Sequence, residues 1–199
     1  AYEYAKGDPD KAIARAVRMI EDEIRTGYQE HVYLEPQALL GIYEGERVSV
    51  YGSMQCPYYI HSGLKQALGW GDDRVRVVQL PTGGGFGGKE EYPSIPGVHA
   101  ALAAIKMGRP VQLVFDRPED IRASTKRHPS IIRIKSHLDA DGRIIAREVD
   151  VKLEAGAYAG LSSVVLQRTI FSVCGVYDVP NLKVTGKAYA TNNIVTGAF

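Results

Sequence analysis

The stretch GGGFGGKEEYPSIP, residues 83–96, decides which class of fold this chain can adopt. It follows RVRVVQL (74–80), a predicted strand, and precedes a helical pattern that ends at Gly108. Five of its first six residues are glycine. Ordering a glycine costs roughly 0.5–1 kcal/mol more than ordering an alanine, because glycine has more freedom to lose. We therefore interpret the stretch as main chain that approaches something large and polar. The alternative is a plain turn without a ligand.

The same stretch nearly matches the nucleotide-binding P-loop, G-x-x-x-x-G-K-[ST]. Gly83, Gly88 and Lys89 fit this pattern, but Glu90 replaces the hydroxyl residue that would hold magnesium. Glu91 adds a second carboxylate beside it. Two carboxylates would repel a triphosphate, so the sequence argues against a P-loop.

A dinucleotide-binding fingerprint is the stronger rival. Gly83-x-Gly85-x-x-Gly88 matches G-x-G-x-x-G after a strand, and Asp116 ends the next expected strand, where a ribose-binding acid would stand. This rival predicts a nicotinamide-dependent oxidoreductase. Its weakness is PSIP (93–96), because prolines fit only the first turn of a helix and delay its start beyond the glycines.

Composition excludes several other classes of protein. The 199 residues carry 24 basic and 23 acidic side chains, a net charge of +1. The chain as a whole therefore lacks the excess of positive charge that attracts nucleic acid or an anionic membrane. No apolar run is long enough to span a bilayer. Cys56 and Cys174 lie too far apart to form a metal-binding pair, and they predict a reducing cytoplasm.

Hydrophobic patterning outside the glycine stretch mixes hairpins with helices. Asp8 and Pro9 begin a helix, and apolar residues at helical spacing continue to Ile20, where IEDEIRTGY reads as a strand. Two hairpins are expected: ALLGIY with RVSVYG, and IIRIKSHLD with RIIAREVDVKLEAGAY. The expected helices cover 57–69, 93–108 and LQRTIFSVCG. The other expected strands are 109–116 and KVTGKAYA. This order predicts an α+β fold, with mixed sheets packed against helices as a two-layer sandwich, not a doubly wound parallel sheet.

Several short motifs occur together in one order. They are QEHVYLEPQ (29–37), YGSMQCPYYIHSGL (51–64), GGGFGGKE (83–90), GRPVQLVFDRPEDI with KRHP, LQRTIF and the terminal TGAF. In this order and spacing the chain resembles the molybdenum-binding large subunit of the xanthine dehydrogenase and aldehyde oxidase family. The resemblance runs over nearly the whole chain. It implies that residues 1–199 form the first cofactor-binding region of a larger subunit, as one unit or two small subdomains.

The resemblance also implies roles for individual residues. Contacts with the molybdenum cofactor are implied for Gln55, Gly84, Gly85, Phe86, Gly87 and Phe199, with Gln55 and Phe86 close to the metal but outside its bonded ligands. Glu90 matches a glutamate that faces the substrate ring, and Arg168 an arginine that stabilises negative charge developing on the substrate. The chemistry agrees, since an amide can donate to a metal-bound oxygen without adding charge.

Each of these residues also has a structural alternative. Gln55 could be a turn residue before Cys56 and Pro57, and Phe86 could anchor the stretch in the core. Lys89 and Glu90 could form a solvated pair, and Arg168 could form a surface ion pair of little energetic value. His31 and His128 are expected to be structural.

The family resemblance further implies the cofactors and partners of the intact protein. These are molybdenum-molybdopterin in its cytosine dinucleotide form, iron–sulfur clusters and FAD on other domains or subunits, a heterocycle or aldehyde as substrate, and an oligomeric assembly. The metal-activating base belongs to a later part of such subunits. We therefore expect the 199-residue chain alone to have little or no turnover.

Overall fold

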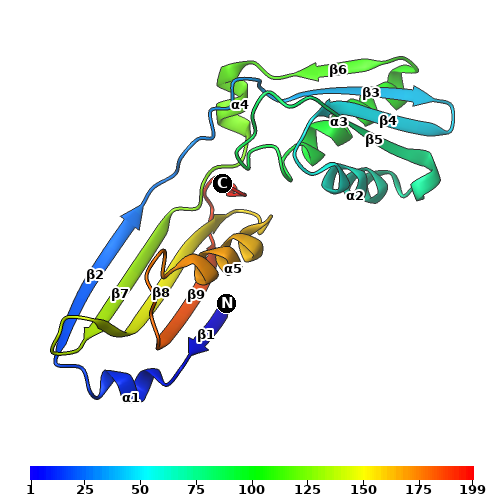
Figure 1. Ribbon diagram of the computed structural model, residues 1–199. Coiled ribbons are helices and arrows are strands. Elements are labelled where there is room, and N and C mark those ends of the chain that lie inside the picture. The colour runs from blue at the N-terminus through cyan, green and yellow to red at the C-terminus, as the bar shows by residue number, and fades with distance from the viewer. The chain divides into compact units, whose positions relative to one another are not determined.

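The computed structural model describes residues 1–199, which divide into two compact units. The first unit comprises residues 1–29 and 128–196, and the second comprises residues 30–127 and 197–199 (Figure 1). Each unit has its own sheet and its own hydrophobic core. None of the helices combines the length and the apolar character needed to cross a bilayer.

A five-stranded mixed sheet forms the first unit. Its strands, in spatial order, are β1 (Tyr2–Lys6), β9 (Leu182–Ala190), β8 (Ile144–Gly156), β7 (Ser130–Leu138) and β2 (Arg18–Thr26). Only β8 and β9 run parallel. Helix α5 (Ser162–Ser172) packs on the sheet through Leu166 and Ile170, which belong to the same buried cluster as Val151. A Cβ on Gly186 would lie 2.7 Å from Ile170 Cδ1, so this glycine lets the helix approach β9 closely.

The start of the chain differs from the expectation. Asp8 caps helix α1 (Pro9–Ile13) by accepting a hydrogen bond from Lys11 N, as predicted, but the helix ends at Ile13. The helical spacing to Ile20 was therefore misleading, because β2 begins at Arg18 and pairs with β7 along its whole length. Long-range strand pairing outweighs a weak local helix preference. Strand β1, which the sequence analysis missed, is a fully exposed edge strand.

The second unit is built on a four-stranded mixed sheet. Its spatial order is β5 (Val75–Leu80), β4 (Arg47–Ser53), β3 (Ala38–Glu44) and β6 (Val111–Val114), with only β4 and β5 parallel. Helices α2 (Pro57–Leu68) and α3 (Ser94–Met107) end at Gly69 and Gly108, both in the left-handed conformation, as predicted. A Cβ on Gly41 would collide with the backbone of Ala100, so α3 lies directly against β3.

Two short helices complete this unit: the 3₁₀ helix η1 (Asp72–Arg74) before β5, and α4 (Arg117–Ala123) after β6. The core contains Leu39, Val50, Ile60 and Leu64, all at most 1% exposed. The fold class is thus confirmed as α+β, with mixed sheets packed against helices. The glycine stretch lies between β5 and α3, where the chain passes from the sheet to the helix layer.

Candidate functional site

The glycine stretch is supported by an irregular segment, residues 31–37, that precedes β3. Alternate side chains of this segment contact the glycines: His31, Tyr33, Glu35 and Gln37. The carboxylate of Glu35 accepts the N–H of Gly83 at 2.7 Å, and Nε2 of Gln37 donates to the carbonyl of Gly88 at 3.0 Å. Both ends of the stretch are therefore fixed by side chains from one neighbouring segment.

Gln55 fixes the same stretch from another direction. Its Oε1 accepts the N–H groups of Gly87 at 2.9 Å and Lys89 at 3.2 Å, and its own N–H donates to the carbonyl of Lys89 at 2.7 Å. Only an amide oxygen can accept these two main-chain N–H groups, so the positions of Oε1 and Nε2 in Gln55 are distinguished. The Nε2 amino group, which donates no hydrogen bond within the chain, is therefore left as a free donor beside the glycines.

The middle of the stretch offers further free donors. The N–H groups of Gly84, Gly85 and Phe86 form no hydrogen bond within the chain, although Gly85 is buried. Buried N–H groups are almost always paired in proteins, so an unpaired one needs an explanation. Together with the amide of Gln55 they form a set of uncharged donors. Such a set fits an oxygen-rich group, which is what a molybdenum cofactor presents.

Two glycines of the stretch cannot be replaced without strain. Gly84 and Gly87 have φ values of +94° and +99°, which side-chain-bearing residues rarely adopt. A Cβ on Gly87 would lie 2.6 Å from the carbonyl carbon of Ala198, and a Cβ on Gly85 would lie 2.5 Å from Oε1 of Gln55. The absence of side chains is thus required by close neighbours as well as by backbone conformation.

Phe86 points outward instead of anchoring the stretch in the core. Its residue is 68% exposed, and its φ of +52° lies in the left-handed region. That conformation costs roughly 1–2 kcal/mol for a residue with a side chain. Such strain is found mainly at functional sites. The alternative of a core anchor is therefore wrong.

The end of the chain returns to the second unit. His31 Nε2 and the carbonyl of Ala198 are hydrogen-bonded at 2.7 Å, and the rings of His31 and Phe199 lie 4.8 Å apart. Because Gly87 also contacts Ala198, Phe199 lies close to the glycine stretch. These contacts agree with a structural role for His31. The buried His128 of the first unit is likewise hydrogen-bonded through Nε2 to Ser162, and a structural role for both histidines stays a prediction.

The two residues expected to act on a substrate fall in different units. Glu90 is half-buried at the end of the glycine stretch, and its N–H donates to the carbonyl of Gly87 at 3.2 Å. Arg168 is exposed on helix α5 of the first unit. The second unit therefore brings together Glu90, Gln55, the glycines, Phe86 and Phe199, but not Arg168.

Glu91 is a buried carboxylate that the sequence analysis had not assigned to the site. Its two oxygens are shielded from solvent, and a Cβ on Gly197 would collide with Oε1. Burial, aided by the negative charge of Glu90, raises the pKa of Glu91 from 4.5 to about 6. Glu91 thus carries a buried negative charge at neutral pH beside the last three residues.

Replacing this carboxylate should stabilise the protein above pH 6. An acid whose pKa rises on folding binds its proton more tightly when folded, so stability increases as the pH falls from about 6 to 4.5. The charged form costs up to about 2 kcal/mol. We expect Glu91→Gln to raise the free energy of unfolding at pH 8 by up to about 2 kcal/mol. The variant should also lose the increase in stability that Glu91 causes between pH 6 and 4.5. Urea unfolding followed by the fluorescence of Trp70, the one tryptophan of the chain, measures this. The exposed Glu46→Gln is the control, and an unchanged pH profile in Glu91→Gln would contradict the assignment.

The geometry disfavours both nucleotide-binding interpretations. Nζ of Lys89 is buried against Glu35 and Ser53, so it is not available to a phosphate. Asp116 Oδ1 accepts the N–H of Glu119 as the N-cap of α4, so this carboxylate has a structural task in the helix start. Helix α3 begins only at Ser94, and its N-terminus therefore cannot meet a pyrophosphate held at Gly88.

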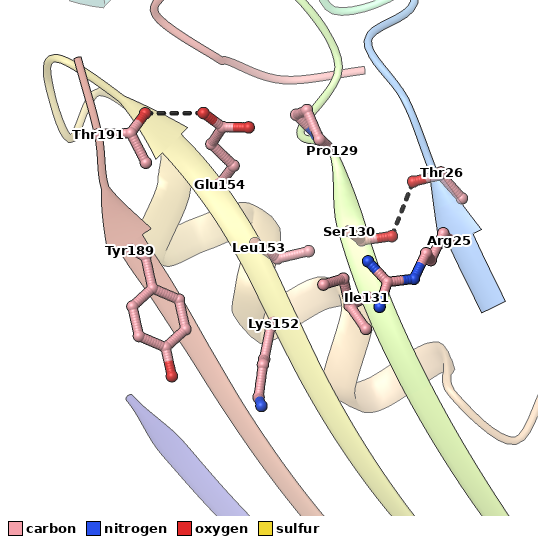
Figure 2. A pocket seen from close by; sticks show the side chains of 10 residues that line it. All are labelled: Arg25, Thr26, Pro129, Ser130, Ile131, Lys152, Leu153, Glu154, Tyr189 and Thr191. Carbon is pink, nitrogen blue, oxygen red and sulfur yellow. Dashed lines mark hydrogen bonds between the residues drawn. The ribbon is translucent and has the colours of Figure 1, made fainter. Parts of the chain in front are cut away.

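The first unit contains a separate cavity of about 670 Å³ on its sheet (Figure 2). Its lining consists of Arg25, Thr26, Pro129, Ser130, Ile131, Lys152, Leu153, Glu154, Tyr189 and Thr191. Glu154 accepts hydrogen bonds from Asn193 and Thr191, which lower its pKa, and Thr26 is bonded to Ser130. These four polar groups are thus already satisfied by hydrogen bonds, while the donors of Lys152 and Tyr189 also line the cavity. None of the predicted site residues lines it.

Sequence reasoning missed the residues that hold the glycine stretch. Tyr33, Glu35 and Gln37 are not predicted to act there, and a solvated pair with Glu90 is only the structural alternative for Lys89. No regular pattern in the sequence marks them, because Val32 has a left-handed φ of +48° and residues 34 and 35 form a bend.

The fold presents a set of uncharged main-chain and amide donors of the kind that suits an oxygen-rich ligand. Residues 1–199 match the family model of the molybdopterin cofactor-binding domain. The chain therefore belongs to this family. It is also similar to proteins named as xanthine dehydrogenases and aldehyde oxidases.

Two curated relatives and one solved structure illustrate the match. The chain is 36% identical over 194 residues to the nicotinate dehydrogenase large molybdopterin subunit of Eubacterium barkeri, covering 97% of this chain and 45% of the relative. It is 32% identical over 197 residues to a probable xanthine dehydrogenase subunit of Bacillus subtilis (strain 168), covering 98% of this chain and 26% of the relative. The aldehyde oxidoreductase of Desulfovibrio gigas shares the fold with a TM-score of 0.88 and 24% identity, covering 100% of this chain and 22% of that one. The chain thus spans less than half the length of these relatives.

Proposed function

We propose that this chain is the part of a molybdenum hydroxylase that holds the oxygen ligands of the metal. The observation that carries the proposal is the double acceptor role of Gln55 Oε1, because it leaves the amino group of Gln55 free to donate to a ligand. The unpaired N–H groups of Gly84, Gly85 and Phe86 stand beside it. When bound, the molybdenum cofactor would supply the redox chemistry that inserts a water-derived oxygen into the substrate.

Each residue of the site has a task in this proposal. Gln55 and the main chain of the glycine stretch orient the cofactor by donating hydrogen bonds, and they add no charge that would disturb the metal. The exposed ring of Phe86 would form an apolar wall against a flat substrate. Phe199 and the half-buried Glu90 flank the same stretch. Glu90 would accept a hydrogen bond from a substrate N–H or, when protonated, donate to a ring nitrogen.

The substrate we infer is an N-heterocycle of the purine type, with aldehydes as the alternative. Glu90 next to the site supports a polar ring, and Arg168 would stabilise negative charge on it in the intact enzyme. The names of the relatives include both nicotinate and xanthine dehydrogenases, which agrees with an N-heterocycle.

The remaining assignments also concern the intact enzyme. We propose that its cofactor carries a cytosine nucleotide, that iron–sulfur and FAD domains or subunits accept the electrons, and that it works as an oligomer in the cytoplasm. The two unpaired cysteines, Cys56 and Cys174, agree with a reducing compartment. Residues 1–199 form its first cofactor-binding region, and this region alone would have little or no turnover.

Metal analysis of the intact purified protein tests the proposal. We expect about one molybdenum per subunit, release of a cytosine nucleotide on acid treatment, and oxidation of at least one compound from a panel of purines, pyridine carboxylates and aldehydes. A saturable change in NADH fluorescence without bound molybdenum would support the dinucleotide rival instead. A protein with neither metal nor NADH binding would be a binding or assembly module.

A further inference from the structure

The side chain of Lys89 is completely buried at the end of the glycine stretch. Its Nζ donates to Glu35 Oε2 at 3.0 Å and to Ser53 Oγ at 2.9 Å, and it lies 4.7 Å from the centre of the Tyr33 ring. A lysine is rarely buried so fully unless it is paired. Burial lowers the pKa of Lys89, and the carboxylate of Glu35 opposes this effect.

The partner carboxylate contacts both ends of the glycine stretch. Oε2 of Glu35 accepts the N–H of Gly83 at 2.7 Å as well as the ammonium group of Lys89. Desolvation pushes the pKa of Glu35 upward, but hydrogen bonds from Ser53, Gly83 and Lys89 outweigh it and lower the pKa. One oxygen atom therefore joins the first residue of the stretch to the side chain that follows its last glycine.

This link acts on the donors of the site through the backbone of Lys89. The N–H of Lys89 donates to Gln55 Oε1, and the carbonyl of Lys89 accepts from Gln55 N. A shift of Lys89 would therefore turn the amide of Gln55 and alter the direction of its free amino group. The unpaired N–H groups of Gly84 to Phe86 lie between the two ends that Glu35 joins, so their spacing depends on the same link.

We propose that Lys89 and Glu35 are positioning residues, whose buried ion pair closes the glycine stretch into a rigid loop and aims the donors of Gln55 and the loop toward the cofactor. This inference rests on the proposed function for the identity of the cofactor. The rigid loop itself is a property of this chain, so it can be tested separately.

Amide hydrogen exchange of the intact protein tests the rigidity of the loop. We expect Glu35→Gln and Lys89→Met to speed exchange in residues 83–90 about tenfold. Glu35→Gln keeps the shape and one acceptor oxygen, and it replaces the other oxygen and the charge with an amino group. It therefore remains informative if Lys89→Met fails to fold. The matched control is Lys126→Met, because Nζ of Lys126 forms a similar buried pair with Glu30 at 2.7 Å and also donates to Ser124, outside the glycine stretch. This control should leave exchange in 83–90 unchanged.

Steady-state kinetics of the same variants test the positioning role. If the donors of Gln55 and the loop are displaced, kcat should fall about tenfold while KM stays within about twofold. A general loss of folded protein would instead lower kcat and the molybdenum content in proportion. Faster exchange in 83–90 of a protein that carries no molybdenum would support the rigid loop and reject the proposed function. Unchanged exchange in a folded Glu35→Gln variant, or an equal increase in Lys126→Met, would overturn the inference.

Discussion

Gln55→Glu should lower kcat/KM of the intact enzyme by about 100-fold while leaving its stability nearly unchanged. The glutamate keeps two oxygens that can accept the N–H groups of Gly87 and Lys89, so the glycine stretch remains fixed. It loses the Nε2 donor and adds a negative charge beside the oxygen ligands that we propose for this site. Loss of one preorganised donor in a water-excluded site typically costs a factor of 10²–10³ in rate.

Two comparison variants separate donation from support of the stretch. Gln55→Ala removes the acceptor as well, so it should lose similar activity and also about 1–3 kcal/mol of stability, because two main-chain N–H groups are left unpaired. Gln112→Glu, an exposed amide on β6, should change neither quantity. The readouts are kinetics on the substrate found for the wild-type protein and urea unfolding followed by Trp70. Full activity in Gln55→Glu would show that amide donation is not needed.

Gly87→Ala should destabilise the second unit by about 3 kcal/mol or more. The new Cβ would be held at a φ of +99°, a conformation that L-residues avoid, and would lie 2.6 Å from backbone atoms of Ala198. Rotating a side chain cannot relieve the close contact with Ala198 or the strained φ, because both involve main-chain atoms. The segment 197–199 should therefore separate from the glycine stretch.

Gly45→Ala is the matched control for this prediction. Gly45 has a φ of +70°, and a Cβ there would meet nothing within 4 Å. Its cost is expected to be about 1 kcal/mol, from the backbone alone. Denaturant unfolding at one pH, with Trp70 as the probe of the second unit, compares the two variants. Equal losses would mean that close packing against Ala198 contributes nothing.

Local sequence was sufficient for most of the secondary structure. The Asp8–Pro9 start of α1, the glycine ends of α2 and α3, and the hairpins β3–β4 and β7–β8 all depend on residues within a few positions of each other. Where a distant partner intervened, the prediction failed. Pairing of β2 with β7 converted the end of an apparent helix into a strand, and β1 forms only because β9 is available to it.

The candidate site shows the same division. The sequence by itself showed that the backbone at 83–88 lacks side chains except at Phe86, because glycine content is readable without coordinates. The grouping of Gln55, Phe86 and Phe199 came from the order of motifs that resembles the family. Only the tertiary structure decided that Lys89 pairs with Glu35, that Phe86 faces outward, and that residues 197–199 return to the glycine stretch. The Lys89–Glu35 pair, the exposure of Phe86 and the return of residues 197–199 all depend on which distant residues are buried together. Local sequence preferences do not encode that choice.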